Sequence, residues 1–251
     1  MCGRFFLVAP AIQVLDAFGL SQADPGIAGY QPRFNISPVQ TILTITSLGS
    51  GRMVISPVIW GMVPIWAART GEPVKPLINV RSETVLDKPM FRRAVNSGRC
   101  LVPASGFFEW LSSGEKSKVP HVIQRPGRKQ LLALAAVTDP GDDPSQRAAA
   151  ILTRASAGPV KGIYERMPVV IEPDDFDAWL DPHRKGGDIE EILARASDRT
   201  ASMELECFEV GREINKATAN SPDLIEPATS QPQKLAKRLR IAAPEQPGLF
   251  G

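Results

Sequence analysis

The chain has 251 residues, 43% of them apolar and 22% charged, which is typical of a soluble globular protein with one domain and a tail. Its 29 basic and 27 acidic residues give a net charge of +2, so any DNA-binding surface must be a local basic patch. Three widely spaced cysteines, two histidines and no long apolar run exclude a disulfide framework, a multi-histidine metal site and a membrane span. We therefore expect a cytoplasmic monomer without metal or cofactor.

Apolar periodicity and turn residues predict the following elements in chain order: a helix over 11–18, strands over 41–46 and 54–60, a helix over 90–96, strands over 100–102, 121–124, 131–137 and 149–153, helices over 174–180 and 189–196, and a strand over 203–210. Strands outnumber helices and do not alternate regularly with them. This pattern indicates an α+β fold with a mainly antiparallel, barrel-like or bifurcated β-sheet surrounded by short helices. The predicted domain covers 1–222, and the proline-interrupted segment 223–251 is expected to be a flexible C-terminal tail.

Cys2 is the candidate nucleophile. Initiator methionine is commonly trimmed before a small residue, and loss of Met1 would give Cys2 both a free α-amine and a free thiol. Their reference pKa values of roughly 7.7 to 8.0 and roughly 8.5 leave part of each group unprotonated near neutral pH. Such a residue can attack an acyl carbon through sulfur, or condense with an aldehyde through nitrogen and close a thiazolidine ring through sulfur.

Six segments in order carry a family resemblance: CGRF at 2–5, YQPRFNISP at 30–38, WGMVPIW at 60–66, NVRSET at 79–84, RCLVPASGFFEW at 99–110 and RMPVV at 166–170. Together they resemble the SOS-response-associated peptidase family, the abasic-site processing proteins. The resemblance runs from Cys2 to about Asp181. It implies that trimmed Cys2 forms a thiazolidine with the ring-opened deoxyribose of an abasic site in single-stranded DNA, with an abasic-lyase side activity and peptidase action limited to removal of Met1.

Residue chemistry supports roles for two further catalytic candidates. Glu109 lies between two aromatic residues, an apolar setting that can raise its pKa and let it transfer protons during sugar ring opening. Asn79 offers amide donors and an acceptor suited to orienting the α-amine and the sugar. For DNA binding, the resemblance implies phosphate contacts and base stacking from a set that also includes Asn79: Arg4, Arg81, Arg166, Thr153, Pro38, Trp66 and Trp110.

Tyr164 departs from the family pattern. It stands two residues before the arginine of the R-x-P segment, where the family usually carries histidine. A phenol with a pKa near ~10 donates a hydrogen bond but shuttles protons poorly near neutrality, where imidazole is well matched. We expect coupling to survive while ring opening, strand cleavage or reversal slows.

The C-terminus carries a second motif, Gln246 followed by Leu249 and Phe250. It resembles the Q-x-x-L-F peptide by which bacterial replication and repair proteins dock on the DNA polymerase sliding clamp. An extended peptide of this type is suited to a preformed apolar groove.

Two other function classes stay open on the sequence. Met-Cys-Gly also begins class II glutamine amidotransferase domains, so Cys2 could serve an N-terminal-nucleophile amidohydrolase, although that family's downstream glutamine-binding signatures are missing. A non-catalytic single-strand DNA module is the other alternative, and Cys2 would be dispensable in it.

Overall fold

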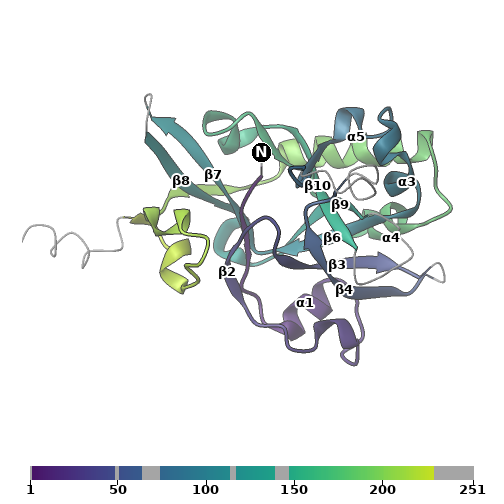
Figure 1. Cartoon of the computed structure of the whole chain (residues 1–251), viewed down its shortest axis with the longest axis horizontal. Helices are drawn as coiled ribbons and strands as arrows, with labels where there is room; N and C mark the ends of the chain where they lie inside the picture. The colour runs from purple at the N-terminus through teal and green to yellow at the C-terminus, as the bar shows by residue number, and fades with distance from the viewer. Residues whose placement is uncertain (1, 49–50, 64–73, 114–116, 139–146, 229–251) are drawn as a thin grey trace, which may run out of the picture.

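Two β-sheets meet along one continuous stretch of chain in the computed structural model (Figure 1), which describes residues 2–48, 51–63, 74–113, 117–138 and 147–228. β6 (Arg99–Ala104) lies in the seven-stranded sheet B, and after Ser105 the chain continues as β7 (Gly106–Ser113) of the five-stranded sheet A. Ser105 fixes this corner, because its N–H donates to the Phe6 carbonyl (2.8 Å) and its Oγ accepts from the N–H of Val8 (3.0 Å).

Sheet A has the strand order β12-β8-β7-β1-β2, with every pairing antiparallel. Its other strands are β1 (Phe5–Leu7), β2 (Arg33–Ile36), β8 (Ser117–Gln124) and β12 (Glu206–Glu209). The β7–β8 hairpin projects away from the rest of the molecule (Figure 1). Its inner ends lie beside the start of the chain.

Sheet B has the order β11-β10-β4-β3-β6-β9, and a further pairing of β9 with β10 closes part of it into a ring. Its other strands are β3 (Thr41–Ser47), β4 (Met53–Trp60), β5 (Asn79–Arg81), β9 (Leu132–Thr138), β10 (Ala148–Ala155) and β11 (Arg166–Pro168). β10 divides its parallel pairing between β4 and β5, and the other pairings are antiparallel. The predicted α+β fold is confirmed, and this closed, bifurcated ring of strands is its barrel-like part.

Four α-helices lie around the sheets in the part of the chain described: α1 (Ala11–Ala17), α3 (Pro89–Ser97), α4 (Phe176–Leu180) and α5 (Gly187–Ser202). α3 and α4 contact β6, and α4 also contacts α5. None of the described helices is long and apolar enough to cross a membrane. All predicted helices and strands are present with shifted ends. The largest shift is at the helix predicted for 189–196, which continues to Ser202 as α5 because its buried stripe extends to Thr200. The strand predicted for 203–210 is correspondingly shortened to β12.

Five strands were not predicted, namely β1, β2, β5, β7 and β11. Three of them have only three residues, too few for an alternating pattern to be recognised. β7 is buried on both faces along its first part, so its apolar residues do not alternate with polar ones. These strands nevertheless carry most of the family motifs.

Two apolar clusters cover the two faces of sheet A. Phe107 and Ile123 pack in the main core together with Cys2, whereas Phe6, Phe108 and Val122 pack in a second cluster. The second cluster also buries Leu224 and Ile225, and Val210 pairs with Pro227 in an isolated bridge. Packed structure therefore continues beyond residue 222, where the tail was predicted to begin.

Gly106 gives a test of the corner between the sheets. A Cβ at this position would lie 2.5 Å from Cζ of Phe6 and 2.7 Å from the Ile123 carbonyl oxygen. We expect Gly106→Ala to lower the free energy of unfolding by about 1–3 kcal/mol through overpacking. Urea unfolding measures this, with Gly162→Ala as the control because nothing lies within 4 Å of a Cβ there. Equal stability of the two variants would show that the corner is not tightly packed.

Candidate active site

Cys2 lies fully buried at the junction of the two sheets. The side-chain amide of Asn79, on β5 of sheet B, donates from Nδ2 to the Cys2 carbonyl oxygen (2.9 Å). On the sheet A side, the N–H of Phe108 donates to the Arg4 carbonyl (2.9 Å), which holds the start of the chain alongside β7. Burial raises the pKa of the Cys2 thiol, and the negative charge of Glu109 raises it further. Cys2 is thus held between one residue from each sheet.

Glu109 is buried on β7, with 2% of its surface exposed. Burial raises the pKa of its carboxyl from 4.5 to about 7. At neutral pH such a carboxyl is present in both protonation states, as a proton donor and acceptor requires.

Tyr164 lies within electrostatic reach of the same carboxyl. Partial burial raises the pKa of its phenol, and the charge of Glu109 and that of Glu165 add to the effect. The structure therefore brings Cys2, Asn79, Glu109 and Tyr164 together, although Cys2 and Tyr164 are 162 positions apart in the sequence.

Arg166, at the start of β11, is bound to protein groups. Its two terminal nitrogens contact the two carboxylate oxygens of Glu83 at 2.7 and 2.8 Å, and Nη2 also reaches Oγ1 of Thr153 at 3.3 Å. Thr153 is buried and registers opposite Arg81 of β5. Thr153 therefore helps to place Arg166, and Glu83, which was not predicted as a site residue, competes with any phosphate for the same guanidinium.

Arg4 is also held within the fold. Nη1 donates to Oδ1 of Asn35 (2.6 Å) and to the Ile214 carbonyl (2.7 Å), and the guanidinium lies over the Trp110 ring at 5.9 Å. Trp110 in turn donates from Nε1 to Oδ1 of Asn215 (2.8 Å). Trp110 is therefore a partner of Arg4 on the second-cluster side of sheet A, opposite to the side that carries Glu109.

The other predicted DNA contacts differ in exposure. Arg81 is exposed at the end of β5, and Pro38 is half-buried. Val39, which follows Pro38, is 62% exposed and has a φ of 66°, a strained conformation for a β-branched residue. Val39 thus offers an apolar contact that the sequence pattern did not single out. Trp66 and the C-terminal residues Gln246, Leu249 and Phe250 lie outside the described residues.

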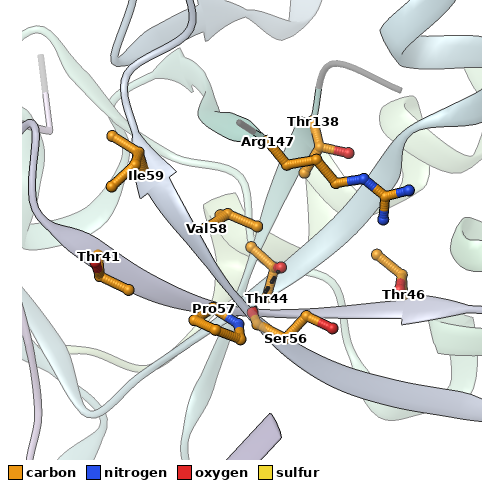
Figure 2. Close-up of a pocket in the computed structure, with 9 residues that line it drawn as sticks. All are labelled: Thr41, Thr44, Thr46, Ser56, Pro57, Val58, Ile59, Thr138 and Arg147. Atoms are coloured by element: carbon orange, nitrogen blue, oxygen red, sulfur yellow. Dashed lines mark hydrogen bonds between the residues drawn. The ribbon is translucent and has the colours of Figure 1, made fainter. Parts of the chain in front are cut away.

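A hollow of about 480 Å³ opens elsewhere, on sheet B. Figure 2 shows Thr138 and Arg147 facing Thr44, Thr46 and Ser56 across it. Hydroxyl and apolar side chains with one guanidinium form its described lining, which includes no thiol and no carboxylate. None of the predicted site residues contributes to this lining.

Comparison with known proteins decides the family. The family model named SOS response associated peptidase (SRAP) matches residues 1–217. This chain belongs to the SRAP family. The abasic site processing protein YoqW of Bacillus subtilis is 32% identical over 229 residues, which covers 90% of this chain and 99% of YoqW. The abasic site processing protein YedK of Escherichia coli is 28% identical, covering 78% of this chain and 84% of YedK.

Solved structures share the fold of this chain. A protein from Bacteroides thetaiotaomicron has a TM-score of 0.72 at 21% identity, covering 90% of this chain and 100% of that one. A phage-related protein from Bordetella bronchiseptica has a TM-score of 0.66 at 24% identity, covering 84% and 95%. The two-sheet arrangement is therefore shared with both proteins.

Glu109 predicts a pH dependence of stability for this SRAP chain. Its folded-state pKa of about 7 lies above the ordinary 4.5, so its contribution to stability is full below about pH 4.5 and is lost as pH rises through 7. Between pH 5 and pH 8.5 the free energy of unfolding of the wild type should fall by up to about 3 kcal/mol relative to that of Glu109→Gln. Urea unfolding at the two pH values measures the difference. Glu165→Gln, at an exposed carboxyl nearby, should show the same pH dependence of stability as the wild type. If Glu109→Gln also showed the wild-type pH dependence, the burial effect would be contradicted.

Proposed function

We propose that this SRAP protein binds single-stranded DNA and couples Cys2, after loss of Met1, to an abasic site as a thiazolidine that shields the lesion. The observation that carries the proposal is the junction of Cys2 with the buried carboxyl of Glu109, whose charge reaches both Cys2 and Tyr164. Relatives named abasic site processing proteins supply the substrate class. An amine, a thiol and a proton carrier at one place are what an aldehyde requires for ring closure.

The reaction balances without a cofactor. The ring-opened deoxyribose presents an aldehyde at C1′. The α-amine of Cys2 adds to that carbon, and loss of the aldehyde oxygen as water leaves an imine. The thiol then adds its sulfur to the same carbon while its proton goes to the imine nitrogen, which closes the five-membered ring. Two steps need an acid: protonation of the sugar ring oxygen, and protonation of the hydroxyl that leaves as water.

Protein groups around Cys2 match these steps. Glu109, with a pKa of about 7, serves as the acid and base. Asn79 holds the Cys2 backbone through Nδ2, while its Oδ1 is buried and accepts no hydrogen bond from the described residues. That oxygen is an acceptor for the α-amine or a sugar hydroxyl. Tyr164 donates a hydrogen bond to the sugar.

The three arginines proposed to bind phosphate differ in exposure and in protein partners. Arg81 is exposed, whereas Arg4 and Arg166 have protein partners. DNA binding through Arg166 requires a phosphate to replace or share the Glu83 carboxylate, in the same forked geometry. The half-buried Pro38 and the exposed Val39 supply contacts to bases beside the lesion.

The two rival functions predict other results. An amidohydrolase would release ammonia from glutamine without coupling to abasic DNA. A non-catalytic DNA-binding module would keep every DNA phenotype in Cys2→Ala. The SRAP family match favours neither.

Cys2→Ser separates the two halves of the proposed chemistry. A serine hydroxyl is a much weaker nucleophile than a thiolate, so the variant should stop at the reversible imine. We expect a heat-stable adduct with abasic single-stranded DNA from the wild type, and from Cys2→Ser an adduct that survives heating only after borohydride reduction. Denaturing gels measure both. A heat-stable, unreduced adduct from Cys2→Ser would rule out the thiazolidine.

Tyr164→His tests the departure from the family pattern. An imidazole beside Glu109 exchanges protons near neutrality far better than a phenol, so crosslink formation should accelerate about tenfold or more. Timed crosslinking at pH 7 measures the rate, with Tyr164→Phe as the control that removes the hydroxyl alone. An unchanged or lower rate for Tyr164→His would count against a proton-transfer limit at this position.

The C-terminal peptide predicts a partner. We expect the full-length chain to bind a bacterial sliding clamp through Gln246, Leu249 and Phe250. Removal of residues 246–251 should abolish binding in a titration calorimetry experiment and leave DNA crosslinking unchanged. Equal clamp binding by both chains, or none by the full-length protein, would remove this partner.

A further inference from the structure

The strand register of sheet A places a histidine beside Glu109. Glu109 of β7 pairs with His121 of β8, and His121 pairs on its other side with Glu209 of β12. Directly opposite residues of antiparallel strands project from the same face, with Cβ atoms ~4.5–5.5 Å apart. Phe107 and Ile123, two positions away, pack in the main core with Cys2, so the row of Glu109, His121 and Glu209 lies on the Cys2 side of the sheet.

Exposure rises along this row. Glu109 is 2% exposed, His121 is half-buried and Glu209 is exposed. The row therefore leads from the buried carboxyl to solvent through one imidazole.

The imidazole is oriented by the backbone. Nδ1 of His121 lies 3.0 Å from the Val119 carbonyl oxygen, which can only accept, so Nδ1 carries hydrogen and donates. This arrangement leaves Nε2 as the nitrogen that gains and loses a proton. A histidine held in this way is a common proton carrier, because imidazole ordinarily changes charge between pH 5 and 8.

We propose that His121 is a positioning and proton-relay residue that recharges Glu109 from solvent during coupling to the abasic site. The inference rests on the proposed function. When Glu109 has given its proton to the sugar ring oxygen or to the departing water, its carboxylate takes one from Nε2 of the imidazolium, which regains it from solvent. No heavy-atom bond changes in the relay. Imidazole thereby acts from β8, while a phenol occupies position 164.

Other charged groups lie near Glu109 and His121. Glu209 faces His121 from β12, while Lys118 and Tyr164 lie within electrostatic reach of Glu109. The hydroxyl-lined hollow on sheet B contributes no group to this row.

A pH–rate profile tests the relay. His121→Asn keeps an N–H donor for the Val119 carbonyl but cannot titrate, so crosslink formation should slow about ten- to hundredfold between pH 6 and 7.5. The affinity for single-stranded DNA and the final crosslink yield should stay the same. A variant that reacted slowly because its structure was damaged would lose affinity or yield as well. His183→Asn, at the chain's other, exposed histidine, is the matched control and should follow the wild-type profile.

Chemical rescue adds a second readout. In His121→Ala, added imidazole should restore the rate in proportion to its concentration, whereas it should not change the rate of Glu109→Gln. A profile of His121→Asn that superimposes on the wild type, or an absence of rescue in His121→Ala, would overturn the relay while leaving the proposed function in place. A wild type that forms no crosslink with abasic DNA would overturn the proposed function and the relay with it.

Discussion

The burial of one carboxyl group constrains the rest of this site. Glu109 is enclosed where sheet A meets sheet B, and removal from water holds its pKa near 7. Its negative charge adds to the effect of burial in raising the pKa of the Cys2 thiol and of the Tyr164 phenol, so the protonation state of Glu109 affects both neighbours. An exposed glutamate in the same place would be fully ionised at neutral pH and could not donate a proton.

The fold provides that enclosure through the corner at Ser105. The strand that ends in the closed ring of sheet B becomes, one residue later, the strand that carries Glu109. β1 adds to the other edge of β7 and brings Cys2 along, while β5 delivers Asn79 from sheet B. Of the arginines proposed to contact DNA, Arg81 is exposed and Arg166 is paired with Glu83.

The candidate site residues are easier to predict from the sequence than the strands that carry them. Cys2, Asn79 and Glu109 were identified from residue type and ordered motifs, and the structure brings them together. Their strands were missed because three-residue strands and doubly buried strands have no alternating pattern. The neighbours that only folding brings close were also missed. Glu83 lies in the 3-10 turn that follows β5, and its role shows only when folding brings that turn to Arg166. The role of His121 shows only when Glu109 faces it across strands, and a one-residue slip would turn His121 to the opposite face.

The proposed coupling requires both the α-amine and the thiol of Cys2. The most direct measurement is mass spectrometry of the N-terminal peptide after incubation of the purified protein with an abasic single-stranded oligonucleotide. We expect a peptide that starts at Cys2, lacks Met1 and carries the adduct on Cys2. Its mass should be the sum of the peptide mass and the mass of the attached DNA, minus one water. An adduct on any other residue, or on a peptide that retains Met1, would contradict the proposed coupling.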